Sequence, residues 1–219
     1  SELWDCLSLG PFCCRKTREE AGWLFLGKRE LQVPAALSTE WLSTNGTGGY
    51  ASSSVVDVHT RRYHGWLMAA VEPPSTRVLC FSRFMERVTI GGHTTEFSSA
   101  EYPGVFHPRG FEHLLAFWDE PVASFLFALN GVRLLRQIYL PGGQDYCVIV
   151  YSSLDPGTSV ELELKPLFNW RHYHHLTHNP HSGWRLAADE RALTVIAPHQ
   201  DRLSLLLGDT RFVSEPKIG

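Results

Sequence analysis

Four consecutive residues, Arg61-Arg62-Tyr63-His64, combine side chains that could recognise a ligand. A guanidinium group binds a carboxylate through two parallel hydrogen bonds and stacks on aromatic faces. Tyrosine and histidine add rings and further hydrogen-bonding groups. If the segment is extended, alternation predicts that Arg61 and Tyr63 share one face and that Arg62 and His64 share the other. A structural interpretation stays open, in which one arginine is solvated and the other pairs with a neighbouring carboxylate.

A glycine-rich run, Asn45-Gly46-Thr47-Gly48-Gly49, precedes this segment by about ten residues. Asn and Gly adopt positive φ at little cost, so the simplest interpretation is a tight turn. A phosphate-binding loop fits poorly, because no Lys-Ser/Thr pair follows the glycines. The alternative is a loop that brings Asn45 and Tyr50 to a surface that faces a sugar.

Five histidines crowd into ten residues: His172, His174, His175, His178 and His181. Imidazole is the commonest metal ligand, so a metal site must be considered. The spacing matches no tetrahedral template, and no cysteine lies nearby. We therefore predict no metal and no cofactor, and keep a His-rich metal-binding interaction domain as the weakest alternative.

Acidic residues are spread along the chain without a motif. Glycoside cleavage needs two carboxyl groups about 5 Å or about 6.5–9.5 Å apart. The candidates are Glu40, Asp57, Glu112, Asp119 and Glu120. No pattern selects a pair among them, so we predict no catalytic residue in this chain.

Three segments together resemble one known family. Residues 40–52 read EWLSTNGTGGYAS, residues 60–65 read TRRYHG, and residues 166–174 read PLFNWRHYH. They are similar to the N-terminal domain of the bacterial and archaeal type of glycogen debranching enzyme, where EWLxTNGxGGYASGT is followed by TRRYHGLL. The resemblance covers roughly residues 39–176. It departs at Ser53, where the family has Gly, and at Thr47, where an apolar residue is common.

This resemblance implies a fold, a role and partners. The family's domain resembles the N-terminal β-supersandwich of bacterial glucoamylases and precedes an (α/α)-barrel that hydrolyses α-1,6 branch points of glycogen. It implies that residues 39–219 are a non-catalytic front end of a glycoside hydrolase, with residues 1–38 an unassigned extension that includes the first strands. The implied partners are that barrel and α-glucans, both glycogen and maltooligosaccharides. An interdomain face left uncovered would also favour self-association of the isolated chain.

The same resemblance gives a list of substrate-binding or domain-interface residues. They are Asn45, Tyr50, Arg61, Arg62, Tyr63, His64, Asn169, Arg171 and His174. An independent carbohydrate-binding module is the main alternative, and it would need an exposed aromatic surface.

Bulk properties exclude several function classes. The 219 residues carry a formal net charge of -3, which does not suggest nucleic acid or an anionic membrane as a partner. No apolar run approaches the ~18 residues of a membrane span, and no signal peptide is recognisable. The five cysteines are odd in number and form no C-x-x-C pair. We therefore expect a reducing, cytoplasmic location.

The elements that must position these residues are strands. Residues 122–129 and 132–140 flank Asn130-Gly131, the strongest short-range hairpin signal. Similar β-prone runs are residues 86–90, 93–97, 146–152, 158–165, 184–188, 192–197 and 202–207. Residues 122–129 are apolar on both faces, which predicts a central strand. Convincing helices are scarce, so we predict an all-β fold, a large antiparallel β-sandwich.

Overall fold

The computed structural model describes residues 24–73, 75–176, 183–189, 192–197 and 202–206. Contacts divide the chain into two compact units, one ending at His174 and one beginning at His175. Each unit is described by itself. Apart from two short 3-10 helices, the regular elements of the described residues are strands, and every strand pairing is antiparallel.

One layer of the first unit is a five-stranded sheet in the order β1-β9-β10-β11-β12. Its strands are β1 (Phe25–Gly27), β9 (Leu114–Trp118), β10 (Ala123–Leu129), β11 (Val132–Tyr139) and β12 (Val148–Ser153). β10 lies in the middle of this order, which confirms that the run apolar on both faces is a central strand.

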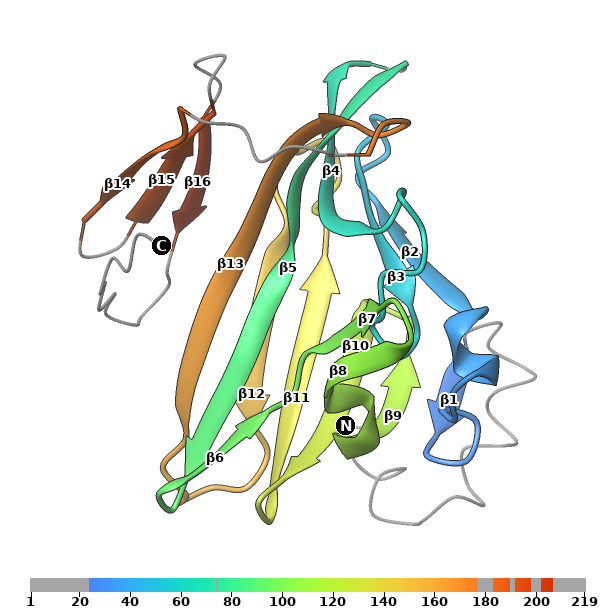
Figure 1. Cartoon of the computed structure of the whole chain (residues 1–219), viewed down its shortest axis with the longest axis vertical. Helices are drawn as coiled ribbons and strands as arrows, with labels where there is room; N and C mark the ends of the chain where they lie inside the picture. Colours follow the sequence, from blue (N-terminus) through green and yellow to red (C-terminus); the bar gives the residue numbers. More distant parts are fainter. Residues whose placement is uncertain (1–23, 74, 177–182, 190–191, 198–201, 207–219) are drawn as a thin grey trace. The chain divides into compact units, whose positions relative to one another are not determined.

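The other layer is a six-stranded sheet in the order β13-β5-β4-β3-β2, with β6 paired to β5. Its strands are β2 (Glu40–Thr44), β3 (Tyr50–Ser54), β4 (Gly65–Glu72), β5 (Thr76–Ile90), β6 (His93–Glu96) and β13 (Glu161–His172). Smaller elements are η1 (Ala35–Leu37), η2 (Gly110–His113), and a hairpin of β7 (Ser99–Tyr102) and β8 (Val105–Arg109). Figure 1 shows β13 and β5 side by side in front of β11 and β12. The predicted antiparallel β-sandwich is confirmed.

The turns behave largely as their residues predict. Asn130 and Gly131 have φ of 48° and 83°, which matches the type I′ turn between β10 and β11. The connection through residues 155–157 differs from the other turns. β12 pairs with β11, and β13 pairs with β5, so the chain crosses from one sheet to the other instead of forming a hairpin.

Aromatic side chains fill the space between the layers. Trp41 of β2 meets Phe125 of β10 edge to face, with ring centroids 5.9 Å apart. Trp66 of β4 packs in the same way on Phe81 and Phe84, at 5.9 Å each. Such pairs add roughly 0.5–1.5 kcal/mol beyond the area that they bury. The chain has seven Trp and twelve Phe residues, and the core accounts for many of them.

A buried ion cluster also joins the two sheets, and no sequence pattern pointed to it. Arg136 of β11 has no exposed surface and donates to Glu86 of β5 over 2.6 Å and to Asp57 over 2.9 Å. The hydroxyl of Tyr151 donates to the second oxygen of Glu86, and the indole N–H of Trp66 donates to Asp57 over 3.2 Å. We call Arg136, Asp57, Glu86 and Tyr151 the Arg136 cluster.

The electrostatics of the Arg136 cluster favour a charged arginine. Burial alone would lower the pKa of Arg136, but the charges of Asp57 and Glu86 outweigh it and raise that pKa above its ordinary value. The rings of Trp66, Phe125 and Phe127 surround the guanidinium group at 4.9, 4.4 and 5.2 Å. A cation over a ring face is stabilised further when it is desolvated.

The second unit contains one three-stranded sheet, β14 (Arg185–Ala188), β15 (Ala192–Ile196) and β16 (Arg202–Leu206). Register places Leu186, Val195 and Leu203 opposite one another. One face of this sheet is therefore apolar. In the part of the chain that the structure describes, no helix is long and apolar enough to cross a membrane.

Candidate functional site

The Arg61–His64 segment is a turn and not a strand. The backbone N–H of His64 bonds to the carbonyl of Arg61 over 3.0 Å, which closes a β-turn between β3 and β4. The alternation of faces was expected only for an extended chain, and this condition is not met. The turn directs Arg61 and His64 to one neighbour and Arg62 and Tyr63 to another.

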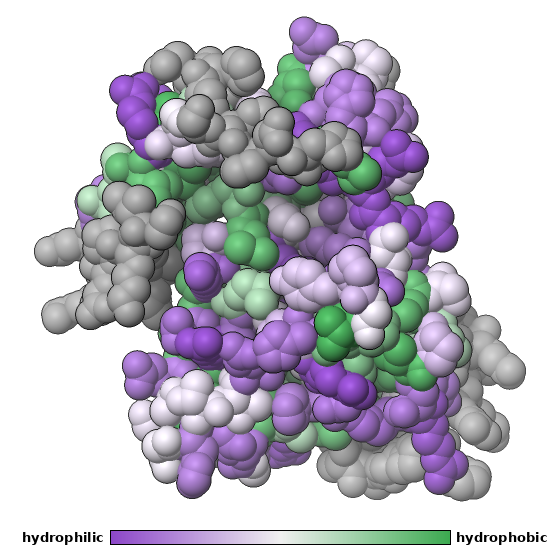
Figure 2. All heavy atoms as spheres, in the orientation of Figure 1, coloured by the Kyte–Doolittle hydropathy of each residue, from purple (hydrophilic) through white to green (hydrophobic). Residues whose placement is uncertain are grey.

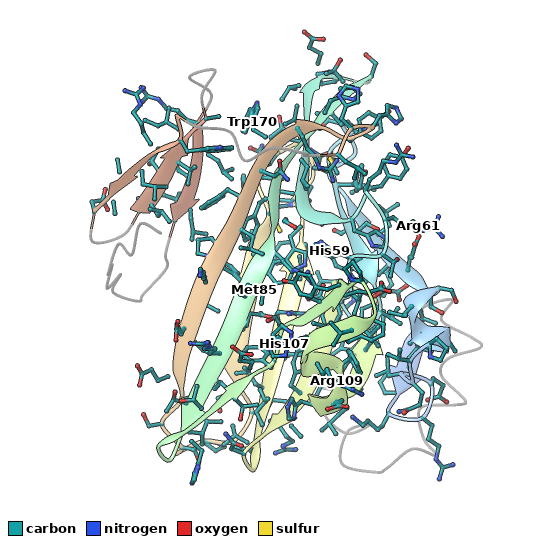
Figure 3. The ribbon with its side chains drawn as sticks, viewed as in Figure 1. His59, Arg61, Met85, His107, Arg109 and Trp170 are labelled. Carbon is teal, nitrogen blue, oxygen red and sulfur yellow. The ribbon has the colours of Figure 1, made fainter. Side chains whose placement is uncertain are left out.

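Arg61 and His64 meet at Glu40, at the start of β2. The Nε atom of Arg61 forms an ion pair with Oε1 of Glu40, and Nε2 of His64 lies 3.2 Å from the same oxygen. Nδ1 of His64 accepts the backbone N–H of Thr60 over 3.1 Å. Burial lowers the pKa of His64, and the Glu40 carboxylate opposes this effect. In Figure 3, Arg61 lies at the outer edge of the turn, whereas His59 lies deeper.

Arg62 and Tyr63 instead reach the end of β13. Arg62 donates from Nη1 to the carbonyl of His174 over 2.9 Å, and the Tyr63 hydroxyl lies 3.1 Å from Nδ1 of His174. Arg171 donates from Nη2 to the carbonyl of Arg62 over 2.6 Å and from Nη1 to the carbonyl of Tyr173 over 3.3 Å. Two of the motifs, more than 100 residues apart, therefore form one structure.

Stacked rings and guanidinium groups also join the β3–β4 turn to the end of β13. The rings of Tyr63 and Tyr173 are 5.8 Å apart, and the ring of His174 lies 3.9 Å from that of Tyr173. Arg62 lies over Tyr63 at 5.4 Å, and Arg77 of β5 lies over Tyr173 at 5.6 Å. We call this group the arginine–tyrosine platform. Its members are Arg62, Tyr63, Arg77, Arg171, Tyr173 and His174.

The glycine-rich motif meets the platform from the other side. Arg77 donates from Nε to the carbonyl of Gly48 over 2.6 Å. Burial, which is the largest cause, raises the pKa of the half-buried Tyr50 to about 12; Arg77 and Arg171 oppose this rise, and Tyr173 adds to it. Tyr50 therefore responds to the charges of the platform, while the hydrogen bond from Arg77 to Gly48 joins the glycine-rich motif to it. All three motifs that resemble the family converge here.

Asn45 lies inside the glycine-rich turn. Its Oδ1 accepts the backbone N–H groups of Thr47 and Gly49 over 3.0 and 2.9 Å. Its Nδ2 donates to the carbonyl of Gln144 and to Asp145 over 2.9 and 3.1 Å. With its amide fully used and its surface buried, Asn45 shapes the loop and lies below any ligand surface. We leave it out of the platform.

Asn169 is half-buried on β13 and accepts the N–H of Trp170 over 2.9 Å. Of the five clustered histidines, His178 and His181 lie outside the described residues. Among the residues that are described, no group of three His, Cys, Asp or Glu side chains could hold a metal ion. The metal-binding alternative therefore gains no support here.

Sequence reasoning missed two platform members, Arg77 and Tyr173. Arg77 gave one usable signal, since it is the only charged residue in the run from Thr76 to Phe81 and stands near the start of a long strand. Figure 2 shows mostly hydrophilic atoms over the region where the end of β13 and the β3–β4 turn lie. The platform combines three guanidinium groups with aromatic rings on a polar surface. Such a surface can bind hydroxyl groups, oxyanions and flat apolar faces.

Two carboxylates lie in the core and not at the platform. Asp57 and Glu86 both bond to Arg136 in the core and therefore do not reach a ligand.

Comparison with known proteins gives one match. A family model described as glycogen debranching enzyme N terminal matches residues 39–218. No curated protein and no solved structure matches the chain.

Proposed function

Because the chain belongs to the glycogen debranching enzyme N-terminal family, we propose that it serves as the non-catalytic N-terminal domain of a debranching glycosidase. In this role it docks on an (α/α)-barrel and shapes the glucan cleft in which the barrel hydrolyses α-1,6 branch points. The glucan is glycogen or a maltooligosaccharide, and the setting is the cytoplasm. The family membership supports the parent enzyme, and the platform supports the docking surface.

One observation carries the docking proposal. The Asn45–Tyr50, Arg61–His64 and Asn169–His174 segments lie far apart in the sequence, yet hydrogen bonds from Arg62, Arg77 and Arg171 join them. Arg62 is exposed, and Tyr63 and Arg171 are half-exposed, so their polar groups are within reach of a partner. Arginine and tyrosine are the residue types most enriched at the centre of protein interfaces.

The experiment combines this chain with the separately produced barrel of a debranching enzyme from the same family. We expect the chain alone to release no glucose from limit dextrin, and its addition to lower the KM of the barrel. Arg171→Ala and Tyr63→Ala should weaken that effect at least tenfold. Arg87→Ala, which changes an exposed ion pair with Glu96 on β6, is the matched control and should have no effect.

Two results would contradict this proposal. Glucose release by the pure chain, abolished by one carboxylate substitution within it, would make the chain itself catalytic. Tight binding of maltohexaose to the chain, with no effect on the barrel, would favour an independent carbohydrate-binding module. The half-exposed rings of Tyr63 and Tyr173 are the feature that such a module would use.

A further inference from the structure

We propose that the arginine–tyrosine platform binds a phosphate monoester carried by a sugar, and so prefers phosphorylated sugars or glucans to neutral ones. The sugar part rests on the proposed function. The phosphate part rests on the charge and geometry of the platform itself.

Two of the platform arginines, Arg62 and Arg77, carry positive charge that no ion pair among the described residues balances. Arg62 and Arg77 bond to the carbonyls of His174 and Gly48, which are neutral acceptors. Among the described residues, no carboxylate forms an ion pair with either of them. By contrast, Arg61, Arg87, Arg109, Arg133 and Arg136 all pair with carboxylates.

The arginines of the platform also repel one another. Burial is the main cause that lowers the pKa of Arg171; Tyr50 opposes this effect, and the charge of Arg62 adds to it. A neutral sugar hydroxyl can accept a hydrogen bond from a guanidinium group, but it removes none of this repulsion. An anion removes it directly, so the platform is better matched to an anionic ligand than to a neutral one.

Phosphate fits this site better than a carboxylate does. A phosphate monoester carries about -1.5 to -2 charges at neutral pH and offers three strong acceptor oxygens, as phosphorylated side chains do. A carboxylate carries one charge, which leaves more of the platform uncompensated. The guanidinium groups are already held by carbonyls and rings, so little ordering is required when the ligand binds.

The rings provide the place for the sugar. Tyr63, Tyr173 and His174 lie within 5.8 Å of one another, centroid to centroid, beside the guanidinium groups. An aromatic ring offers an apolar face to the C–H side of a sugar, and its polar edge can bond to hydroxyl groups. A ligand with both a sugar and a phosphate would therefore use both halves of the platform.

The test is calorimetric titration of the full 219-residue chain with glucose 6-phosphate, glucose and inorganic phosphate. We expect glucose 6-phosphate to bind at least about tenfold more tightly than the other two, and about 0.5 M NaCl to weaken it strongly. Arg62→Gln removes one exposed guanidinium group and should raise the Kd for glucose 6-phosphate about tenfold or more. Tyr63→Leu should reduce the difference between the Kd for glucose 6-phosphate and the Kd for inorganic phosphate, because it removes a ring that contacts the sugar.

A control variant shows whether any loss of binding is specific to the platform. Arg133→Gln removes an arginine that is paired with Asp155 away from the platform, and it should leave the Kd unchanged. Melting curves by circular dichroism verify that each variant is folded. Equal affinity for glucose and glucose 6-phosphate, no effect of Arg62→Gln, or no binding at all would each overturn the proposal. Inorganic phosphate that binds as tightly as glucose 6-phosphate would overturn its sugar part. If the chain still lowers the KM of the barrel, the proposed function survives this failure.

Discussion

The first unit holds arginines in two opposite settings. In the Arg136 cluster, one guanidinium group faces two carboxylates and three aromatic rings, with no surface left for solvent. In the arginine–tyrosine platform, three guanidinium groups face backbone carbonyls and tyrosine rings. In the first setting, two carboxylates of the chain balance the charge of Arg136. In the second, we propose that an external ligand balances the charge of Arg62 and Arg77.

The difference shows how burial determines what an arginine can do. A charge deprived of water costs several kcal/mol unless counter-charges and hydrogen bonds replace the solvent. Arg136 therefore required Asp57 and Glu86, and it joins the sheets as a result. Partly exposed guanidinium groups carry a smaller penalty, so Arg62 and Arg77 can remain without a carboxylate. Changes in the cluster should affect stability, and changes in the platform should affect binding.

Arg136→Met should give the largest loss of stability. The substitution leaves Asp57 and Glu86 buried without their counter-ion, which costs about 3–5 kcal/mol when one member of a buried ion pair is removed. Urea denaturation followed by tryptophan fluorescence measures the change. Adding Glu86→Leu and Asp57→Asn to the same chain should recover part of the loss. If the Arg136→Met variant is as stable as the wild type, the Arg136 cluster does not stabilise the packing of the two sheets.

Tyr151→Phe tests the same cluster more gently. The hydroxyl of Tyr151 donates to Glu86, and its removal leaves one carboxylate oxygen with a lost bond. The expected cost is about 1–3 kcal/mol, as for a buried acceptor that loses its donor. The urea midpoint should fall with an unchanged slope. The comparison variant is Tyr139→Phe on β11, because Tyr139 has no hydrogen bond to a buried charged group among the described residues.

Acidification should destabilise the fold through His59 and His64, the two histidines beside the β-turn. Burial lowers the pKa of His59 well below its ordinary value and lowers that of His64 as well. Below the ordinary histidine pKa of about 6.5, the unfolded chain binds protons that the folded chain still excludes. The free energy of unfolding therefore decreases as the pH is lowered. The slope approaches about 1.4 kcal/mol per pH unit for each such proton. His59→Asn should flatten the dependence between pH 7 and 5; an unchanged slope would contradict the buried neutral histidine.

Arg62→Ala should change stability least. The side chain is exposed and bonds to one carbonyl, and such surface substitutions stay within about 0.5 kcal/mol. The same urea experiment measures it beside Arg136→Met. A loss comparable with that of Arg136→Met would make the platform a structural element, and the contrast between the two arginine settings would disappear.

The sequence predicted the features that depend on local patterns. Asn130-Gly131 marked its hairpin because both residues tolerate positive φ, and the doubly apolar run became the central β10. The resemblance to the family directed attention to Arg62, Arg171 and His174, which the fold brings together.

What was missed depends on tertiary contacts. Arg136 finds Glu86 and Asp57 at separations of 50 and 79 residues, and no spacing rule reports such partners. The side-chain directions of Arg61–His64 could be predicted only for an extended segment, and the segment is a β-turn. Asn45 was proposed for a ligand surface, but the residue type alone cannot show that its amide makes two hydrogen bonds inside the loop and two more to Gln144 and Asp145.

The bonds between Arg62, Arg171 and His174 have a consequence for synthesis on the ribosome. They join residues 109 to 112 positions apart. At about 5–20 residues per second, Arg62 is made roughly 6 to 22 s before His174. During that interval β5 lacks the β13 strand that covers its edge, and its unpaired backbone N–H and C=O groups stay available to other chains. A translational pause before β13 would lengthen this exposure, whereas a pause after it would not.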